Sequence, residues 1–309
     1  MKKYDMLYPP LVERISAEEE RRVHMSASAR SLEAGCDFYH KKTQKAAKTR
    51  LHQMFGAYLH GNAHKKASRI LARQTHSGHR GHVSASAHSL EVGRSFLCIE
   101  NKPDAEALLA LHASTRERLP HIKNFYEFIA AHAGENKTSC EIKTISDLGC
   151  GFNPFALPLM PAEFTHSLEA YHAWDIDLRT RDLLSIFFAA QDLPQTAKCA
   201  DLITDTPAIS ADVIFMLKLL PVLEAQSPGR GFALANAQNA RFLIITYPTK
   251  SLGGREKGME KNYSAAFENA VASGALSNFK PVASEKIGNE LVYVLVSPMY
   301  THYIRTKSR

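Results

Sequence analysis

The chain has 309 residues, of which 45% are hydrophobic, so it is long enough to form one large folded domain or two moderate ones. No apolar run is long enough to span a membrane, because the best candidate, residues 213–223, is short and contains Lys218 and Pro221. The N-terminus lacks the hydrophobic segment of a signal peptide, and the 5 cysteines show no metal-ligand or redox spacing. We therefore expect a cytoplasmic protein without a membrane segment or a metal site.

The positive charge is concentrated in the first part of the chain. Residues 1–120 contain 20 lysines and arginines against 12 acidic residues, whereas residues 121–309 contain 18 against 19. The N-terminal segment also carries 10 of the 15 histidines. A basic module attached to a near-neutral domain predicts a polyanionic partner. A basic surface that is merely solvated is the alternative interpretation.

The first 120 residues are predicted to be mainly helical. One helix follows Tyr8-Pro9-Pro10, a second spans residues 41–58 and contains Lys48 and Arg50, and a third spans residues 104–119. The third is expected to bury Leu108, Leu109, Leu111 and Leu119. Between them, residues 61–93 are polar, rich in histidine and poorly periodic, so no regular element is predicted there.

From about residue 121 the pattern changes to alternating strands and helices, of which the clearest helix spans residues 178–190. The predicted strands span residues 142–146, 170–174, 198–200, 212–217, 242–247, 281–286 and 290–297. The last two are joined across Gly288-Asn289 like a hairpin. Five parallel strands and a terminal hairpin predict an α/β fold, the Rossmann-like seven-stranded sheet of S-adenosylmethionine-dependent methyltransferases, in which the last strand is antiparallel.

The segment that follows the first predicted strand, residues 147–154, has the features of a cofactor-binding loop. It begins with Asp147, and its two glycines, Gly149 and Gly151, make a tight turn to which a ligand can come close. The third glycine of a dinucleotide fingerprint is missing, because Pro154 follows Asn153. The loop therefore favours S-adenosylmethionine over NAD. A structural turn without a ligand is the alternative.

Acidic residues follow the second and third predicted strands, where a methyltransferase sheet meets its cofactor. Asp175 is suited to accept both ribose hydroxyls, with Asp177 as a competitor, and Asp201 is suited to accept from the adenine amino group while Leu202 covers the ring. Taken singly, each aspartate is also a candidate helix N-cap, but their recurrence at successive strand ends favours a cofactor site. The predicted site also includes Ile176 and Leu217.

Basic residues at the ends of later strands predict contacts with RNA. Lys218 interrupts an apolar run, so it is expected to face the cleft or to pair with an acid. The segment 247–263 combines glycines, basic residues, Met259 and Tyr263, a composition suited to hold phosphates and to support a displaced base. A mobile surface loop is the alternative. The predicted RNA-binding residues are Lys48, Arg50, Lys218, Lys250, Arg255, Lys257, Met259 and Asn262.

Several stretches, read together, resemble the aminoglycoside-resistance 16S rRNA methyltransferases, namely the Arm/Rmt enzymes and their counterparts in aminoglycoside-producing actinomycetes. The stretches are residues 111–119 (Leu-His-Ala-Ser-Thr-Arg-Glu-Arg-Leu), 149–154, 218–221, 251–263 and 288–291. The resemblance covers residues 106–297 and returns at residues 3–12 and 50–59. Residues 24–48 and 60–105 depart from the family pattern.

The resemblance implies that the protein transfers a methyl group from S-adenosylmethionine to N7 of guanine 1405 of 16S rRNA, within the assembled 30S subunit of a bacterium. It also implies that Arg118 holds the cofactor carboxylate, with His112 nearby. Residues 1–105 would form a helical rRNA-docking domain and residues 106–309 the methyltransferase domain. We expect a monomer.

Guanine N7 has a lone pair and no proton, so we expect catalysis by positioning alone, with no residue that transfers a proton. Two alternatives remain. One is a methyltransferase that acts at another rRNA site, such as N1 of adenine 1408. The other is a non-catalytic RNA-binding protein on a methyltransferase fold.

Overall fold

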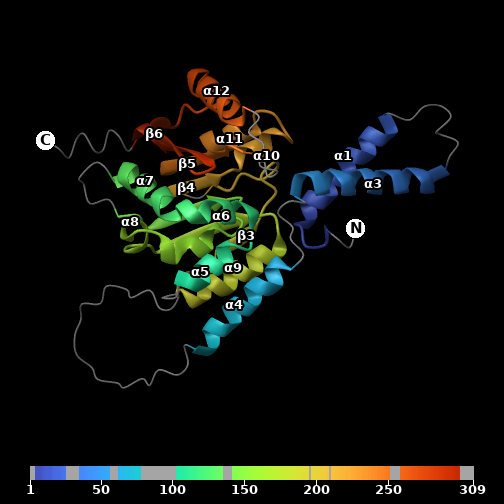
Figure 1. The fold of residues 1–309 in the computed structure, drawn as a ribbon. Helices are drawn as coiled ribbons and strands as arrows, with labels where there is room; N and C mark the ends of the chain where they lie inside the picture. The colour runs from blue at the N-terminus through green and yellow to red at the C-terminus, as the bar shows by residue number, and fades with distance from the viewer. Residues whose placement is uncertain are drawn as a thin grey trace.

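The computed structural model describes residues 4–25, 35–55, 62–77, 102–134, 141–194, 196–208, 210–250 and 258–299. Its centre is a seven-stranded sheet in the order β3-β2-β1-β4-β5-β7-β6, with helices on both faces (Figure 1). The strands are β1 (Thr144–Leu148), β2 (Ala170–Asp175), β3 (Ala197–Cys199), β4 (Ala211–Leu217), β5 (Ala240–Pro248), β6 (Lys280–Ile287) and β7 (Glu290–Val296). The first five are parallel, and β7 runs antiparallel to β5 and β6. The predicted sheet, including its terminal hairpin, is confirmed.

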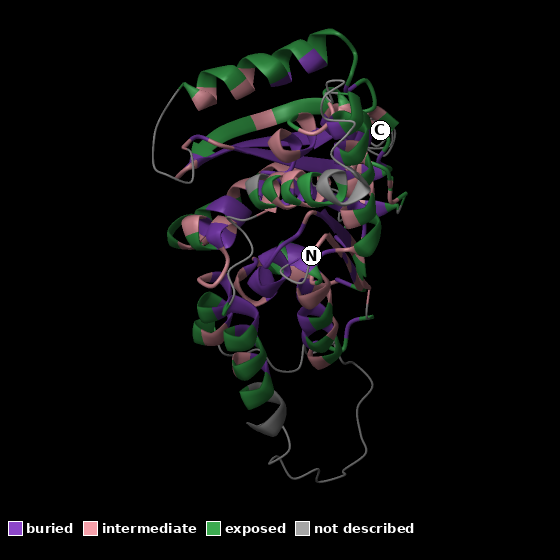
Figure 2. Cartoon of the chain, turned by 90° about the vertical axis from the view of Figure 1, so that its right-hand side faces the viewer, coloured by how far each residue is buried: buried purple, intermediate pink, exposed green. Residues whose placement is uncertain are grey.

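The sheet is buried on both faces, as the near-continuous apolar sequence of its central strands requires. In β4, Val213 and Phe215 join one hydrophobic cluster, while Ile214 and Met216 join the cluster on the opposite face. Buried residues accordingly follow the strands and the inner faces of the helices, and exposed residues cover the outer faces (Figure 2). β6 is an edge strand with mostly exposed, partly charged side chains, which discourage pairing with another chain.

The helices of the sheet domain divide between these two faces. The first cluster contains residues of α5 (Lys102–Leu109), α7 (Ile122–Gly134) and α9 (Leu178–Ala190), and the second contains residues of α10 (Leu220–Glu224), α11 (Arg230–Asn236) and α12 (Met259–Ala272). The shorter elements are α6 (Ala113–Arg118), α8 (Ala162–Thr165) and the 3-10 helices η3 (Leu119–His121) and η4 (Asn153–Leu159). None of the helices in the described residues is long and apolar enough to cross a membrane.

Two N-terminal helices, α1 (Pro9–Met25) and α3 (Gly35–Phe55), pack against each other and project from the side of the sheet domain (Figure 1). Leu11 and Ile15 of α1 share a small core with Leu51 of α3. The segment before α1 is tied to the residues that follow β2, because Leu7 and Asp177 form an isolated antiparallel bridge and the Tyr8 amide donates to the Ile176 carbonyl at 2.8 Å. This attachment places α1 beside the carboxyl end of the sheet.

Two sequence predictions in the N-terminal part are wrong. Residues 63–77, for which no element was predicted, form α4 (Ala63–Ser77). Ala63, Ala67 and Leu71 are buried at helical spacing opposite exposed lysines and arginines, so the sequence carries an amphipathic helical pattern that the prediction did not use. α3 begins at Gly35 instead of residue 41. α4 packs against α9 and α5 of the sheet domain.

The single helix predicted over residues 104–119 is two helices. α5 ends at Leu109, and α6 begins after His112, which has an extended backbone with φ −111° and ψ 134°. The Thr115 hydroxyl is positioned to donate to the Leu109 carbonyl at 2.6 Å, while the His112 carbonyl accepts from the Arg116 amide at 2.9 Å, so backbone acceptors on both sides of the break are paired. Because of the break, Leu111 and Leu119 are only partly buried, whereas Leu108 and Leu109 are fully buried as expected.

Candidate functional site

A pocket opens at the carboxyl end of the parallel strands, where ligands bind in open α/β sheets. Of the eleven predicted cofactor residues, all but Asp147 line it: His112, Arg118, Gly149, Gly151, Asn153, Asp175, Ile176, Asp201, Leu202 and Leu217. Asp147 is fully buried next to the lining residue Asn153, and its Oδ2 accepts from Asn153 Nδ2 at 2.8 Å. The fold thus gathers the predicted residues in one place, while their individual contacts with a cofactor stay predictions.

The loop after β1 needs glycine at two positions. Gly149 has φ +66° and Gly151 has φ +50°, a backbone region that other residues rarely adopt. A Cβ on residue 151 would lie 2.9 Å from Cε1 of His112, and one on residue 149 would lie 2.8 Å from Cδ1 of Leu219. The turn is therefore both tightly bent and closely packed, and it leaves its backbone open towards the pocket.

Asp175 ends β2 and is fixed by two backbone amides. Its Oδ2 accepts from the Gly151 amide and its Oδ1 from the Asp177 amide, each at 2.8 Å. Burial raises the pKa of Asp175 to about 6, although these amides favour the ionised carboxylate. Asp177, its competitor in the sequence, caps α9 by accepting from the Arg179 amide at 2.8 Å. That structural role favours Asp175 as the ligand-facing acid.

Asp147 has a free acceptor in a buried position. Its Oδ2 accepts from the Tyr171 hydroxyl as well as from Asn153, whereas its Oδ1 has no hydrogen-bond partner among the described groups. Burial raises the pKa of Asp147 to about 6, against the effect of the Asn153 and Tyr171 hydrogen bonds. An acceptor beneath the pocket without a donor, together with the open glycine turn, fits a ligand that carries a cationic or hydrogen-donating group.

Arg118 belongs to a network of four charged side chains, of which Arg118, Glu290 and Lys218 are buried and Glu117 is partly exposed. Its Nε and Nη2 donate to the two carboxylate oxygens of Glu290 at 2.7 and 2.6 Å, and its Nη1 donates to Asn153 Oδ1 at 2.8 Å. Lys218 Nζ lies 2.8 Å from Glu117 Oε2 and 3.4 Å from Glu290 Oε1. Glu290 therefore takes the bidentate edge of Arg118. A cofactor carboxylate would meet the remaining N–H groups on Nη1 and Nη2.

Lys218 is held in an uncommon backbone conformation directly after β4. Its φ is +55°, and its amide donates to the Thr246 carbonyl at 3.1 Å and to the Thr246 hydroxyl at 3.0 Å. Left-handed backbone at a non-glycine residue costs on the order of 1 kcal/mol and is typical of functional sites. Lys218 pairs with acids and also lines the pocket, so it meets both expectations for its position.

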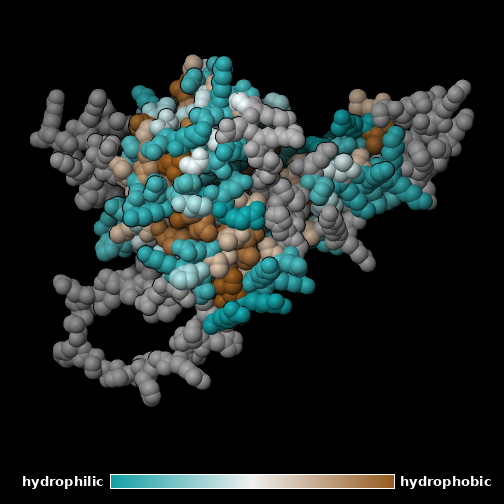
Figure 3. All heavy atoms as spheres, in the orientation of Figure 1, coloured by the Kyte–Doolittle hydropathy of each residue, from teal (hydrophilic) through white to brown (hydrophobic). Residues whose placement is uncertain are grey.

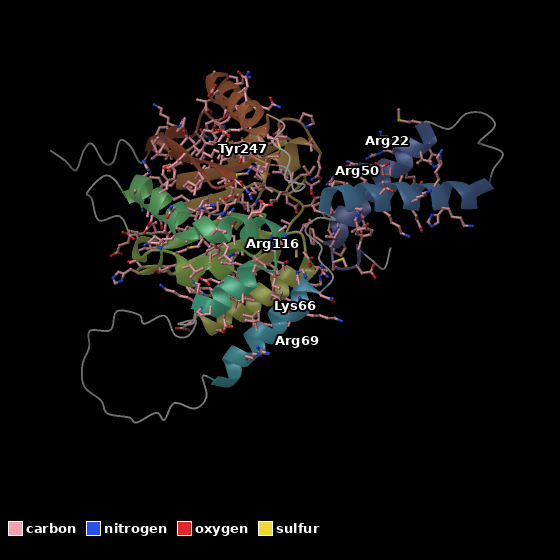
Figure 4. All side chains as sticks on the ribbon, viewed as in Figure 1. Arg22, Arg50, Lys66, Arg69, Arg116 and Tyr247 are labelled. Carbon is pink, nitrogen blue, oxygen red and sulfur yellow. The ribbon has the colours of Figure 1, made fainter. Side chains whose placement is uncertain are left out.

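A second cleft adjoins the pocket and is lined by basic side chains from both parts of the chain. Lys218 and Ser114 line both the pocket and the cleft. The cleft is also lined by Arg22, Lys42, Lys45, Arg50, Lys250, Met259 and Tyr263, and by two acids, Glu19 and Glu117, so basic residues outnumber acidic ones. The ring of Tyr263 stacks on Tyr247 with centroids 5.1 Å apart (Figure 4 labels Tyr247). A cationic cleft with an aromatic wall is suited to a nucleic acid.

Four of the predicted RNA-binding residues line this cleft, namely Arg50, Lys218, Lys250 and Met259. Lys48 and Asn262 lie in α3 and α12 but are not among the residues that line it. Arg255 and Lys257 fall outside the described residues. All eight assignments therefore stay predictions.

The outer face of α4 forms a further basic surface. Lys65, Lys66, Arg69 and Arg73 are exposed, and α4 contains no acidic residue. In Figure 3, hydrophilic side chains predominate on the visible, described parts of α4 and of the α1–α3 pair, with some hydrophobic ones between them. Figure 4 labels exposed cations that come from α1 (Arg22), α4 (Lys66 and Arg69) and α6 (Arg116). The basic excess of the N-terminal segment thus appears at the surface.

Sequence reasoning missed several residues that complete the site. Glu290 joins Arg118 to Lys218, and although residues 288–291 belong to the stretches that carry the family resemblance, no role was predicted for this carboxylate at the start of an apolar strand. His64 of α4 and Leu11 of α1 line the pocket from the N-terminal segment, and Gln226 lines it from the sheet domain. No spacing in the sequence indicates these contacts, because they exist only after the helices dock. Among the described residues, no group of three or more His, Cys, Asp or Glu side chains could hold a metal ion.

Comparisons with known proteins agree with this geometry. Residues 99–294 match the family model described as Ribosomal RNA methyltransferase (FmrO). A 16S rRNA (guanine(1405)-N(7))-methyltransferase of Serratia marcescens is 31% identical over 294 residues, which cover 95% of this chain and 93% of the relative. A protein of the same name from Micromonospora echinospora is 34% identical over 251 residues, covering 81% of each chain.

Solved structures agree as well. The crystal structure of the 16S rRNA methyltransferase RmtF in complex with S-adenosyl-L-homocysteine superposes with a TM-score of 0.72 at 30% identity, covering 96% of this chain and 94% of that one. The 16S rRNA methylase RmtB superposes with a TM-score of 0.67 at 27% identity, covering 96% and 94%. The predicted family and fold are confirmed. The chain belongs to the FmrO family of ribosomal RNA methyltransferases.

Proposed function

We propose that the protein transfers the methyl group of S-adenosylmethionine to N7 of guanine 1405 of 16S rRNA and thereby confers aminoglycoside resistance. The observation that carries this proposal is the junction of two sites. The pocket bounded by the glycine loop, Asp175 and Asp201 shares Ser114 and Lys218 with the basic cleft. The relatives from Serratia marcescens and Micromonospora echinospora bear the name of this activity, and RmtF was solved with S-adenosyl-L-homocysteine.

The bound cofactor supplies an activated methyl group on its sulfonium, and the side chains of this chain bind and orient it. Asp175 accepts from the ribose hydroxyls, Asp201 accepts from the adenine amino group, and Leu202 packs on the adenine ring. Arg118 donates to the cofactor carboxylate through the N–H groups that Glu290 leaves available. Because guanine N7 has no proton to lose, the protein needs only to hold the flipped base in line and to exclude water.

The second part of the proposal concerns the partner. The protein binds the assembled 30S subunit as a monomer in the bacterial cytoplasm, with residues 1–105 as the docking domain and residues 106–309 as the methyltransferase domain. Its support is the exposed cationic face of α4 and the cations that α1 and α3 bring to the cleft. Substitution of Arg255 or Lys257 is also expected to weaken productive engagement of the 30S subunit.

The proposal is tested by incubating the full chain with tritiated S-adenosylmethionine and 30S subunits. Label should appear in 16S rRNA, and primer extension should stop at guanine 1405. Cells that express the chain should become resistant to aminoglycosides but remain sensitive to apramycin. Modification at adenine 1408 would instead bring apramycin resistance, and no transfer to 30S subunits would leave only a non-catalytic RNA-binding role.

Cofactor binding should weaken in mild acid. Burial raises the pKa of Asp175 to about 6, and the ribose hydroxyls need its ionised form as their acceptor. The Kd for S-adenosylhomocysteine should therefore be flat above pH 7 and rise as the pH falls through about 6, by up to about tenfold per pH unit. Calorimetry in a constant-ionic-strength buffer series measures this profile.

The same shift has the opposite effect on the stability of the ligand-free protein. The folded pKa of Asp175 lies above its ordinary value of 3.8, so the folded state binds more protons than the unfolded state between about pH 4 and 6. The contribution of this carboxyl to the free energy of unfolding should fall as the pH rises through that window. In an Asp175→Asn variant, the Kd should no longer rise steeply in mild acid, and this contribution to the pH dependence of the free energy of unfolding should be absent. If the Kd of the variant still depended on pH as in the parent, the titration would be assigned to Asp147.

Charge reversal on α4 should weaken rRNA docking without changing cofactor binding. Lys66→Glu and Arg69→Glu change exposed side chains that do not line the pocket, so binding of S-adenosylhomocysteine should be unchanged. Binding to 30S subunits should weaken by about tenfold, with a slope in log K against log salt that is smaller by about 1 for each lost phosphate contact. Glu285→Lys on the exposed edge strand β6 is a control that should not weaken docking. Equal 30S affinity in the α4 variants and the parent would remove α4 from the docking surface.

A further inference from the structure

The helix α1 contributes an arginine to the adenine end of the pocket. Arg14 donates from Nε to Asp201 Oδ2 at 2.6 Å and from Nη2 to Asp201 Oδ1 at 3.3 Å. The Asp201 side chain is only 4% exposed and that of Arg14 is 15% exposed. These residues are 187 positions apart in the chain, so the ion pair forms only when α1 lies against the sheet domain.

Arg14 fixes the Asp201 carboxylate without using all of its acceptor capacity. Oδ1 also accepts from the Ile203 amide at 3.2 Å, whereas Oδ2 receives only the Arg14 Nε among the hydrogen bonds of the described residues. A carboxylate oxygen has two lone pairs, so Oδ2 can accept one more donor. Arg14 Nη2 also donates to Gln226 Oε1 at 3.1 Å, and both Asp201 and Gln226 line the pocket. The arginine therefore orients two pocket residues at once.

The same arginine connects the pocket to the basic cleft. Arg14 Nη1 donates to Glu18 Oε1 at 2.9 Å, and Glu18 Oε2 lies 2.7 Å from Nη1 of Arg50 in α3. Arg50 lines the cleft and lies 3.1 Å from Oε1 of the buried Glu19. A continuous series of ion pairs thus runs from Asp201 through α1 to α3. Asp201 in the pocket and Arg50 in the cleft are therefore connected through Arg14 and Glu18 of α1.

We propose that Arg14 is a positioning residue for adenine recognition and that, through it, α1 couples cofactor binding to rRNA docking. This inference rests on the proposed role of Asp201 as acceptor of the adenine amino group. With Arg14 in place, Asp201 stays oriented with Oδ2 available, so the cofactor binds best when α1 is docked. By thermodynamic linkage, the bound cofactor favours the docked α1–α3 pair to the same extent, and this is the arrangement that presents the cleft to rRNA.

The adenine readout is measured by calorimetry on the full chain with two ligands, S-adenosylhomocysteine and its inosine analogue, which has an oxygen in place of the 6-amino group. The parent should prefer the adenine ligand by about tenfold or more, because a buried acceptor is left facing an acceptor in the analogue. Arg14→Gln should weaken binding of the adenine ligand by about tenfold and of the analogue much less, so the preference shrinks. Arg14→Lys keeps one charged contact, so its preference for the adenine ligand should lie between those of the parent and of Arg14→Gln.

Arg241→Gln is the matched control. Arg241 is also a partly buried arginine paired with an aspartate, Asp212 at 3.2 Å, but it lies at the opposite ends of β4 and β5 from the pocket. Its replacement should leave the preference between the two ligands unchanged. Equal weakening of both ligands by Arg14→Gln would reduce Arg14 to a scaffold residue. Tighter binding of the adenine ligand would mean that Arg14 competes with adenine for Asp201. Either result overturns the inference, and so does an Arg14→Gln variant that binds both ligands as tightly as the parent.

The coupling is measured by binding of 30S subunits with and without saturating S-adenosylhomocysteine. The ligand should tighten the parent's binding by about fivefold or more, a typical coupling between two sites, and this gain should disappear in Arg14→Gln. A gain of equal size in the parent and in the variant would contradict the coupling. Methyl transfer by the parent distinguishes a failure of the proposed function from a failure of this inference. If the parent methylates 30S subunits but shows no ligand preference, only this inference fails, whereas no transfer at all would contradict the proposed function itself.

Discussion

Replacing Asp175 with alanine is expected to weaken the binding of S-adenosylhomocysteine by about 100-fold or more. The proposed contact joins one carboxylate to two ribose hydroxyls, and each hydrogen bond to a charged group contributes about 1.5–3 kcal/mol. The substitution also removes the acceptor of the Gly151 and Asp177 amides, which fix the loop after β1. Calorimetry with the full chain measures the affinity, and methyl transfer to 30S subunits should fall in parallel at subsaturating cofactor.

Asp212 provides the matched control for Asp175. Its Oδ2 likewise accepts from two backbone amides, those of Lys143 at 2.8 Å and Thr144 at 3.0 Å, but at the opposite end of the sheet from the pocket. Asp212→Ala should therefore lower stability without changing cofactor affinity. If Asp175→Ala bound the ligand within about threefold of the parent, a difference of less than 1 kcal/mol, the assignment of Asp175 to the ribose would be wrong.

The second large effect is expected at Glu290. Its side chain is 3% exposed and pairs with both Arg118 and Lys218, so Glu290→Gln removes the negative charge that neutralises two buried cations. Breaking a buried ion pair by removing one partner costs about 3–5 kcal/mol in the free energy of unfolding. The pKa of Glu290 lies below its ordinary range, because the attraction of Arg118 and its hydrogen bonds outweigh the opposing effect of burial. The stabilisation is therefore present at neutral pH and is lost as the pH falls through that lowered pKa.

Urea unfolding measures the effect of Glu290→Gln, with Glu260→Gln as the control. Glu260 pairs with Lys286 at 2.6 Å, but both side chains are 45% exposed, so its replacement should cost less than about 1 kcal/mol. Methyl transfer should fall further for Glu290→Gln than its stability alone explains, because Arg118 and Lys218 line the pocket. Equal stability of the two variants would show that Glu290 is not the partner that keeps these cations in place.

The sheet was predictable because its signals are local. The central strands β4 and β5 are apolar runs buried on both faces, and the two glycines after β1 are required by positive φ angles at those positions. The acids Asp175 and Asp201 were found because the carboxyl ends of parallel strands meet on one edge, so their order in the chain predicts their gathering in space.

The N-terminal part was less predictable. α4 has an amphipathic pattern, but its apolar stripe consists partly of small alanines and lies in a polar, histidine-rich stretch, so no element was predicted there. The break between α5 and α6 involves a local contact of the Thr115 hydroxyl with the Leu109 carbonyl, which the periodicity of residues 104–119 does not indicate. Both matter for the site, because α4 brings His64 to the pocket and the break places His112 against Gly151.

By itself, the sequence determined the sheet, the glycine loop, the acids at the strand ends and the segregation of positive charge, since these follow from local patterns. The tertiary structure alone decided which charges meet. Glu290 occupies the bidentate edge of Arg118 from a strand 172 positions away, and Arg14 reaches Asp201 across 187 positions. Such pairs depend on how whole elements dock, and docking is set by the shapes and charges of surfaces that no spacing along the chain encodes.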